Sequence, residues 1–127
     1  MQIKVNFGEI CLFIKKRLDK DVKIKYVNPS TVLIDFIINV ELSIKSLEAN
    51  TIKIGYSMNS FAEMMAKSQI KAAFESVDPN VGTLDMNNKE ITINIANIPQ
   101  MQKFIENFII SSAGFDATGL NIELSVK

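Results

Sequence analysis

The 127-residue chain contains no histidine or tryptophan, a single cysteine, a single arginine, three prolines and five glycines. Without histidine, it lacks the commonest general base near neutral pH and the commonest metal ligand. The single Cys11 cannot form an internal disulfide, and with no histidine beside it a zinc site is not expected. The scattered glycines form none of the loops that bind phosphates or dinucleotides. We therefore expect no enzymatic activity, no metal and no cofactor.

The charges of the chain balance, with 14 Lys and Arg against 14 Asp and Glu. Nucleic-acid-binding domains usually carry a basic excess and use arginine to contact phosphates and guanine edges. The balance and the single Arg17 therefore argue against nucleic acid as a partner. Residues 1–25 are nevertheless basic, with Lys4, Lys15, Lys16, Arg17, Lys20, Lys23 and Lys25 against Glu9, Asp19 and Asp21. The basic segment 15–25 is either a face for an acidic partner or anionic lipid, or the solvated end of a helix.

Apolar residues make up 47% of the chain, enough to form a hydrophobic core at this length. We expect one domain spanning residues 1–127. No apolar run approaches the roughly 20 residues of a transmembrane segment, and the run at 10–14 is too short for a signal peptide. These features, with the single cysteine, predict a cytoplasmic protein.

Residues 32–44 carry the most regular pattern, because every even-numbered residue is apolar: Val32, Ile34, Phe36, Ile38, Val40, Leu42 and Ile44. Strict alternation without Gly or Pro favours one long strand over two short ones. Such a strand, extended to residue 45, would contain fourteen residues and measure about 46 Å, whereas a domain of this size is about 35 Å across. The sequence therefore predicts a strand that curves strongly or contains a bulge.

Three amphipathic stretches predict helices at residues 9–18, 60–77 and 99–112. A capping box formed by Ser60 and Glu63 would begin the second helix, and Gly114 would end the third. Shorter alternating segments predict strands at 3–7, 22–26, 52–58, 91–95 and 120–126, and Asn87-Asn88 predicts a hairpin turn. The predicted fold is α+β: a single strongly curved antiparallel sheet with about three helices packed on its apolar face.

The second half of the chain resembles a known family. Asn88-Lys-Glu-Ile-Thr-Ile-Asn-Ile, a helix from Pro99, and Phe115-Asp-Ala-Thr-Gly-Leu-Asn-Ile-Glu-Leu-Ser-Val are similar to the closing hairpin, helix and strand of small bacterial tubular lipid-binding domains. A curved sheet around a helix is the shape of that superfamily. The resemblance implies carriage of a lipid or another apolar ligand.

Three functional hypotheses of different classes follow. The first is a non-enzymatic binding domain that holds an apolar small molecule or lipid between helix 60–77 and the sheet. Its candidate ligand-binding residues are Phe36, Met58, Phe61, Met64, Met65, Phe104 and Phe108, although methionines fill cores as well as adaptable pockets. The second is a protein–protein interaction or self-associating scaffold domain, because Leu33 and Ile37 make the strand apolar on both sides near residues 32–38. The third is an enzyme that uses carboxylates alone, with Asp35 as the candidate.

Overall fold

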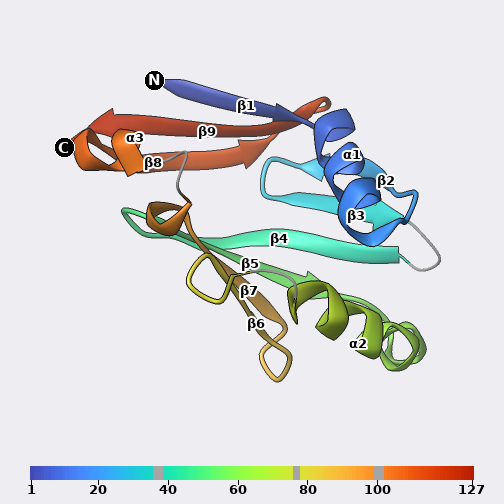
Figure 1. Ribbon diagram of the computed structural model, residues 1–127. Coiled ribbons are helices and arrows are strands. Elements are labelled where there is room, and N and C mark those ends of the chain that lie inside the picture. Colours follow the sequence, from blue (N-terminus) through green and yellow to red (C-terminus); the bar gives the residue numbers. More distant parts are fainter. Residues whose placement is uncertain (36–38, 76–77, 99–101) are drawn as a thin grey trace.

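A computed structural model describes residues 1–35, 39–75, 78–98 and 102–127 (Figure 1). The elements are β1 (Gln2–Asn6), α1 (Phe7–Leu18), β2 (Lys23–Asn28), β3 (Thr31–Asp35), β4 (Asn39–Leu47), β5 (Thr51–Ser57), α2 (Ser60–Glu75), β6 (Gly82–Asp85), β7 (Glu90–Asn94), the 3-10 helix η1 (Ile95–Asn97), α3 (Gln102–Asn107), β8 (Phe108–Phe115) and β9 (Gly119–Val126). The strands predicted at 3–7, 22–26, 52–58, 91–95 and 120–126 are confirmed as β1, β2, β5, β7 and β9.

The strands form two antiparallel sheets. The large sheet has the order β2-β3-β4-β5-β7-β6, and the small sheet has the order β1-β9-β8. Strand makes up 51% and helix 27% of the chain, neither sheet is closed or strongly curved, and of the described helices only α1 and α2 exceed six residues. The antiparallel arrangement and the mixed α and β content are confirmed. The predicted single, strongly curved sheet with about three helices on its apolar face is wrong.

The long strand predicted at 32–44 is a hairpin of β3 and β4. Asp35 lies opposite Asn39, Ile34 opposite Val40 and Val32 opposite Leu42. In each pair, both residue numbers are even or both are odd. Even-numbered residues of the two strands therefore lie on the same face of the sheet. Three residues connect the strands, and an odd number preserves the alternation that a two-residue turn would have inverted. The uninterrupted pattern therefore concealed a reversal of chain direction.

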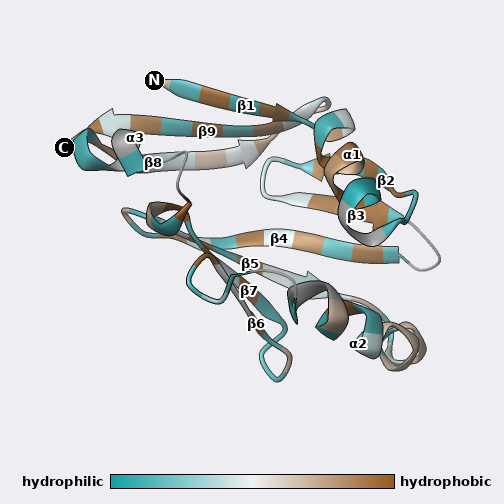
Figure 2. Cartoon of the chain, viewed as in Figure 1, coloured by the Kyte–Doolittle hydropathy of each residue, from teal (hydrophilic) through white to brown (hydrophobic). Residues whose placement is uncertain are grey.

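Hydropathy alternates along strands of the large sheet (Figure 2), and the pairing register assigns their residues to two faces. One face carries Ile24, Tyr26, Val32, Ile34, Val40, Leu42, Ile44, Ile52, Ile54, Tyr56, Leu84, Ile91 and Ile93. The opposite face is mostly polar, with Lys23, Lys25, Leu33, Asp35, Glu41, Ser43, Lys53, Asp85, Glu90 and Thr92. Leu33 is half-buried there, and Ile37 lies outside the described residues. An antiparallel sheet with one apolar face needs a covering layer on that side only.

The small sheet supplies much of that layer. Its buried Ile110 and Leu124 join Ile52 and Ile95 in one hydrophobic cluster. The partly buried residues around it come from both sheets: Ile3, Ile44, Leu47, Ile54, Ile93, Phe108 and Ile122. In Figure 1, β8 is the strand of the small sheet nearest the large one. The core therefore lies between two sheets rather than inside one curved sheet.

Backbone hydrogen bonds and one aromatic contact complete the connection. The Ile110 N–H donates to the Ala49 carbonyl at 3.0 Å, and the Phe115 N–H donates to the Pro29 carbonyl at 2.7 Å. The ring of Phe115 also lies 6.4 Å from that of Phe7, at the start of α1. Both ends of β8 are thus tied to loops of the large sheet, and α1 is tied to the small sheet.

The helix predicted at 99–112 is only partly correct. Residues 99–101 lie outside the described part, α3 covers Gln102–Asn107, and β8 begins at Phe108. Gly114 lies within β8, and no glycine of the described chain has a positive φ, so it is not a helix cap. The pairing of Ile110 with Leu124 buries a side chain in the common core, and this tertiary contact overrides the local helical spacing.

The turn between β6 and β7 also differs from the prediction. Positive φ occurs at Lys89 rather than at the two preceding asparagines. The Asp85 carboxylate accepts hydrogen bonds from the N–H groups of Asn87 and Asn88, at 3.0 and 3.1 Å. These hydrogen bonds hold the pKa of Asp85 below its ordinary value. A side-chain-to-backbone turn of this kind is a common use of aspartate.

Candidate functional site: the outer face of helix α2

Asn59 caps the amino end of α2, one residue before its first helical residue. Its side-chain oxygen accepts a hydrogen bond from the Ala62 N–H at 2.7 Å, and its carbonyl accepts one from the Glu63 N–H at 2.9 Å. Asparagine is among the best residues at this position, because its side chain satisfies a backbone donor that the helix leaves open. The prediction that Ser60 caps the helix is therefore off by one residue.

Glu63 fixes the first turn of α2 to the large sheet. Its carboxylate lies 3.0 Å from the Lys89 ammonium, and the Lys89 carbonyl accepts a hydrogen bond from the Tyr56 N–H at 2.9 Å. Burial raises the pKa of the Tyr56 hydroxyl, and the negative charge of Glu63 raises it further. Glu63 thus takes part in a sheet contact rather than in the predicted capping box.

Two alanines form the buried face of α2. Ala62 and Ala66 are each 4% exposed and lie four residues apart, on the same side of the helix. Alanine is short, so the helix axis can lie close to the sheet with little side-chain volume between them. Among the described residues, α2 contacts strand β6 of the large sheet.

Three large apolar side chains lie on the outside of the same helix. Phe61 is 68% exposed, Met64 73% and Met65 53%. At about 100° per residue, these positions cluster on the side away from Ala62 and Ala66. Two lysines, Lys67 and Lys71, are exposed on the next turns. Phe61, Met64 and Met65 are called the α2 apolar face below.

The structure separates the five candidate ligand-binding residues whose side chains it describes. Phe61, Met64 and Met65 lie together on the α2 apolar face, whereas Met58 is half-buried just before the helix. Phe108 packs against the core between the sheets. Phe36 and the side chain of Phe104 lie outside the described residues. The alanine pair at i and i+4 is the sequence signal that could have identified the inward face, since small residues allow close packing.

The structure also locates the candidate for acid–base chemistry, Asp35. Asp35 is half-buried at the end of β3, on the polar face between Lys23 and Asn39. Within the described residues, His, Cys, Asp and Glu side chains form no group of three suited to a metal ion. None of the described helices has both the length and the hydropathy to span a membrane.

Comparisons with protein-family models, with curated proteins and with solved structures gave no match for this chain. The resemblance to tubular lipid-binding domains therefore stays a prediction.

Proposed function

We propose that this protein is a non-enzymatic interaction domain whose α2 apolar face binds an amphipathic, acidic segment of another protein. The observation that carries the proposal is the exposure of three large apolar side chains on one side of a single helix, at 68%, 73% and 53%. Isolated exposed apolar residues are normal on a protein surface, whereas a contiguous group marks an interaction site.

The apolar group gives such an interaction its driving force. Full burial of a phenylalanine or methionine side chain contributes about 1.5–3 kcal/mol relative to exposure. Association costs about 4 kcal/mol or more in lost translational and rotational freedom, so three residues alone support a weak complex. Methionine adapts its shape to different partners, which suits a helix that pairs with another helix.

The charges beside the apolar face favour an acidic partner. Lys67 is exposed one turn after Met64 on the helix surface, and Lys71 is exposed one turn further along. Glu63 lies 3.0 Å from Lys89, so its charge is largely compensated. Positive charge therefore borders the apolar residues, and complementary charges on a partner speed association and select the partner.

The proposal can be tested with three synthetic helical peptides of about 20 residues. One has a leucine stripe flanked by glutamates, the second has the same stripe flanked by lysines, and the third is scrambled. Binding is measured by nuclear magnetic resonance titration of the labelled protein. We expect the acidic peptide to bind with a Kd of about 10–100 µM, with shifts concentrated in α2. The lysine-flanked peptide should bind at least about tenfold more weakly.

A combined Phe61→Ser, Met64→Ser and Met65→Ser variant should lose binding and keep its fold, because the replaced side chains are exposed. Leu12→Ser is the matched control, since Leu12 is 65% exposed on a different helix. Equal binding by the triple variant and the wild type would refute the proposal. Uptake of a fluorescent fatty acid without peptide binding would instead favour the apolar-ligand hypothesis. A concentration-dependent dimer lost in the triple variant would favour self-association.

A further inference from the structure

Helix α1 presents a second surface, with a different composition. Its half-buried residues Phe7, Ile10, Cys11 and Ile14 follow helical spacing and face the protein. Leu12 and Phe13 lie elsewhere on the helix surface and are 65% and 60% exposed. The single cysteine, Cys11, therefore lies on the inward side of the helix, and Phe13 does not.

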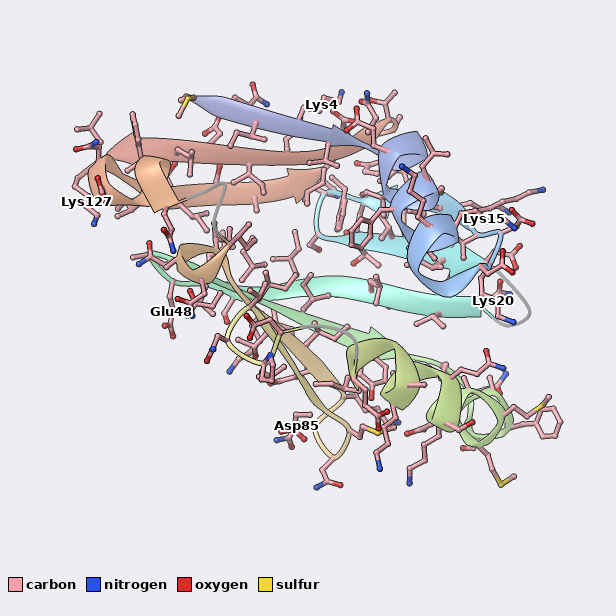
Figure 3. The ribbon with its side chains drawn as sticks, viewed as in Figure 1. Lys4, Lys15, Lys20, Glu48, Asp85 and Lys127 are labelled. Atoms are coloured by element: carbon pink, nitrogen blue, oxygen red, sulfur yellow. The ribbon has the colours of Figure 1, made fainter. Side chains whose placement is uncertain are left out.

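Charged side chains flank these exposed residues on both sides along the helix: Glu9 lies one turn before Phe13, and Lys15 lies one turn after Leu12. Lys16 is exposed and lies one turn after Leu12, on the same line of the helix. Lys15 lies 3.3 Å from Asp19 and 3.5 Å from Asp21, which compensates part of its charge. Residues 7–27 carry Lys15, Lys16, Arg17, Lys20, Lys23 and Lys25 against Glu9, Asp19 and Asp21, six positive charges against three negative, a net charge of +3. Figure 3 shows Lys15 and Lys20 near the carboxyl end of α1.

Strand β2 lies beside this helix at the edge of the large sheet and contacts it. Its Lys23 and Lys25 are exposed, and so are Tyr26 and Val27, at 41% and 52%. Lys23 and Lys25 lie on the polar face of the large sheet and Tyr26 lies on its apolar face. The basic-apolar surface is therefore defined by Leu12, Phe13 and Lys16 of α1.

We infer that the basic-apolar surface docks the protein on an anionic membrane. A helix held in place by one face, with apolar and aromatic residues on the other beside lysines, matches the composition of segments that lie in the lipid headgroup region. Lysine heads contact anionic lipids while their aliphatic stems cover apolar surface. Charge complementarity favours this occupant over a neutral apolar partner, because the net charge of the segment is positive. This inference does not depend on the α2 proposal, since the two surfaces share no residue.

The inference can be tested by cosedimentation of the full chain with vesicles. One set contains phosphatidylcholine with about 30% phosphatidylserine, and the other contains phosphatidylcholine alone. We expect the anionic vesicles to bind at least about tenfold more protein, and raising the salt from about 0.1 M to about 0.5 M should release most of it. Equal binding to both kinds of vesicle, or to neither, would overturn the inference.

Matched variants separate this surface from general charge and hydropathy. Lys16→Glu and Leu12→Gln should each weaken partitioning by about fivefold or more. Lys127→Glu and Val126→Gln make the same kinds of change at exposed positions at the end of the chain, outside both proposed surfaces, and they should leave vesicle binding unchanged. Equal losses in both pairs would overturn the assignment to α1. Binding to soluble polyglutamate without binding to vesicles would also overturn it, and would point to an acidic protein partner instead.

Discussion

Replacing Leu124 with alanine tests whether the two sheets share one core. Leu124 is 6% exposed, pairs with Ile110 across β8 and β9, and belongs to the cluster with Ile52 of the large sheet. The change removes three carbons, worth about 2.4 kcal/mol in transfer free energy, and leaves a cavity that raises the cost. We expect a loss of about 3 kcal/mol in the free energy of unfolding. With an unfolding entropy of about 0.27 kcal/mol/K for a chain of this length, the Tm should fall by about 11 °C.

The assay is urea and thermal unfolding followed by circular dichroism. Val126→Ala is the control, because Val126 lies on the same strand and is 76% exposed. It should cost less than about 0.5 kcal/mol. Leu124→Ala should lower the urea midpoint while leaving the slope of the transition unchanged, since the same surface is exposed on unfolding. Similar costs for both variants, or separate transitions for two parts of the wild-type chain, would refute the shared core.

Three further predictions concern local structure. Gly119→Ala should lower the free energy of unfolding by about 1–3 kcal/mol, because a Cβ there would lie 2.9 Å from the Asn6 Cα and closer still to the carbonyl oxygen of Val5. The control is Gly8→Ala, whose Cβ would meet nothing within 4 Å. It should leave the free energy of unfolding in urea titrations unchanged or raise it by about 0.5 kcal/mol. Asn59→Ala should cost about 1 kcal/mol in the same assay through loss of the α2 cap, and an unchanged midpoint would contradict that role. Hydrogen bonds from the Asn121 side chain, then from the Thr118 N–H, hold the pKa of the Asp116 carboxyl well below its usual range. The stability that Asp116 adds over an Asp116→Asn variant should therefore be full above about pH 5 and decline as acid protonates the carboxylate. Measuring the Tm of both proteins across pH tests this dependence.

Sequence periodicity predicted most of the strands and the extents of α1 and α2, because alternation and helical spacing both reflect burial on one side. It could not distinguish one long strand from the β3–β4 hairpin. Asp35 pairs with Asn39, and a connection of three residues leaves the alternation unchanged. Without that long strand, the inference of a strongly curved sheet had no basis.

The β8 strand was missed because helical and extended spacing overlap there. Phe108 and Ile109 continue a spacing that fits a helix, yet both belong to a strand paired with β9. The partners of Phe108 and Ile109 in β9 lie more than ten residues away in the sequence. Local strand or helix propensity does not depend on such distant residues. The pairing with β9 and the contact of Ile110 with Ala49, in a loop of the large sheet, together favour the strand.

In the candidate site, the sequence predicted which residues group together but not the direction in which their side chains point. The sequence identified Phe61, Met64 and Met65 as a group on one helix, and the structure keeps them together. The sequence predicted that these side chains face the sheet, because large apolar residues are usually buried. The sheet instead accepts Ala62 and Ala66, which are 4% exposed, and the larger side chains remain outside. Which side of an apolar helix faces inward depends on the shape of the surface that receives it.

The outward orientation of the α2 apolar face can be measured by methionine oxidation. Dilute protein is treated with hydrogen peroxide, and the oxidation rate of each methionine is followed by peptide mass spectrometry. Met64 and Met65 should oxidise about as fast as an unfolded peptide, since they are 73% and 53% exposed, whereas the half-buried Met58 should react more slowly. Protection of Met64 and Met65 equal to that of Met58 would contradict the account, because these side chains would then face the protein.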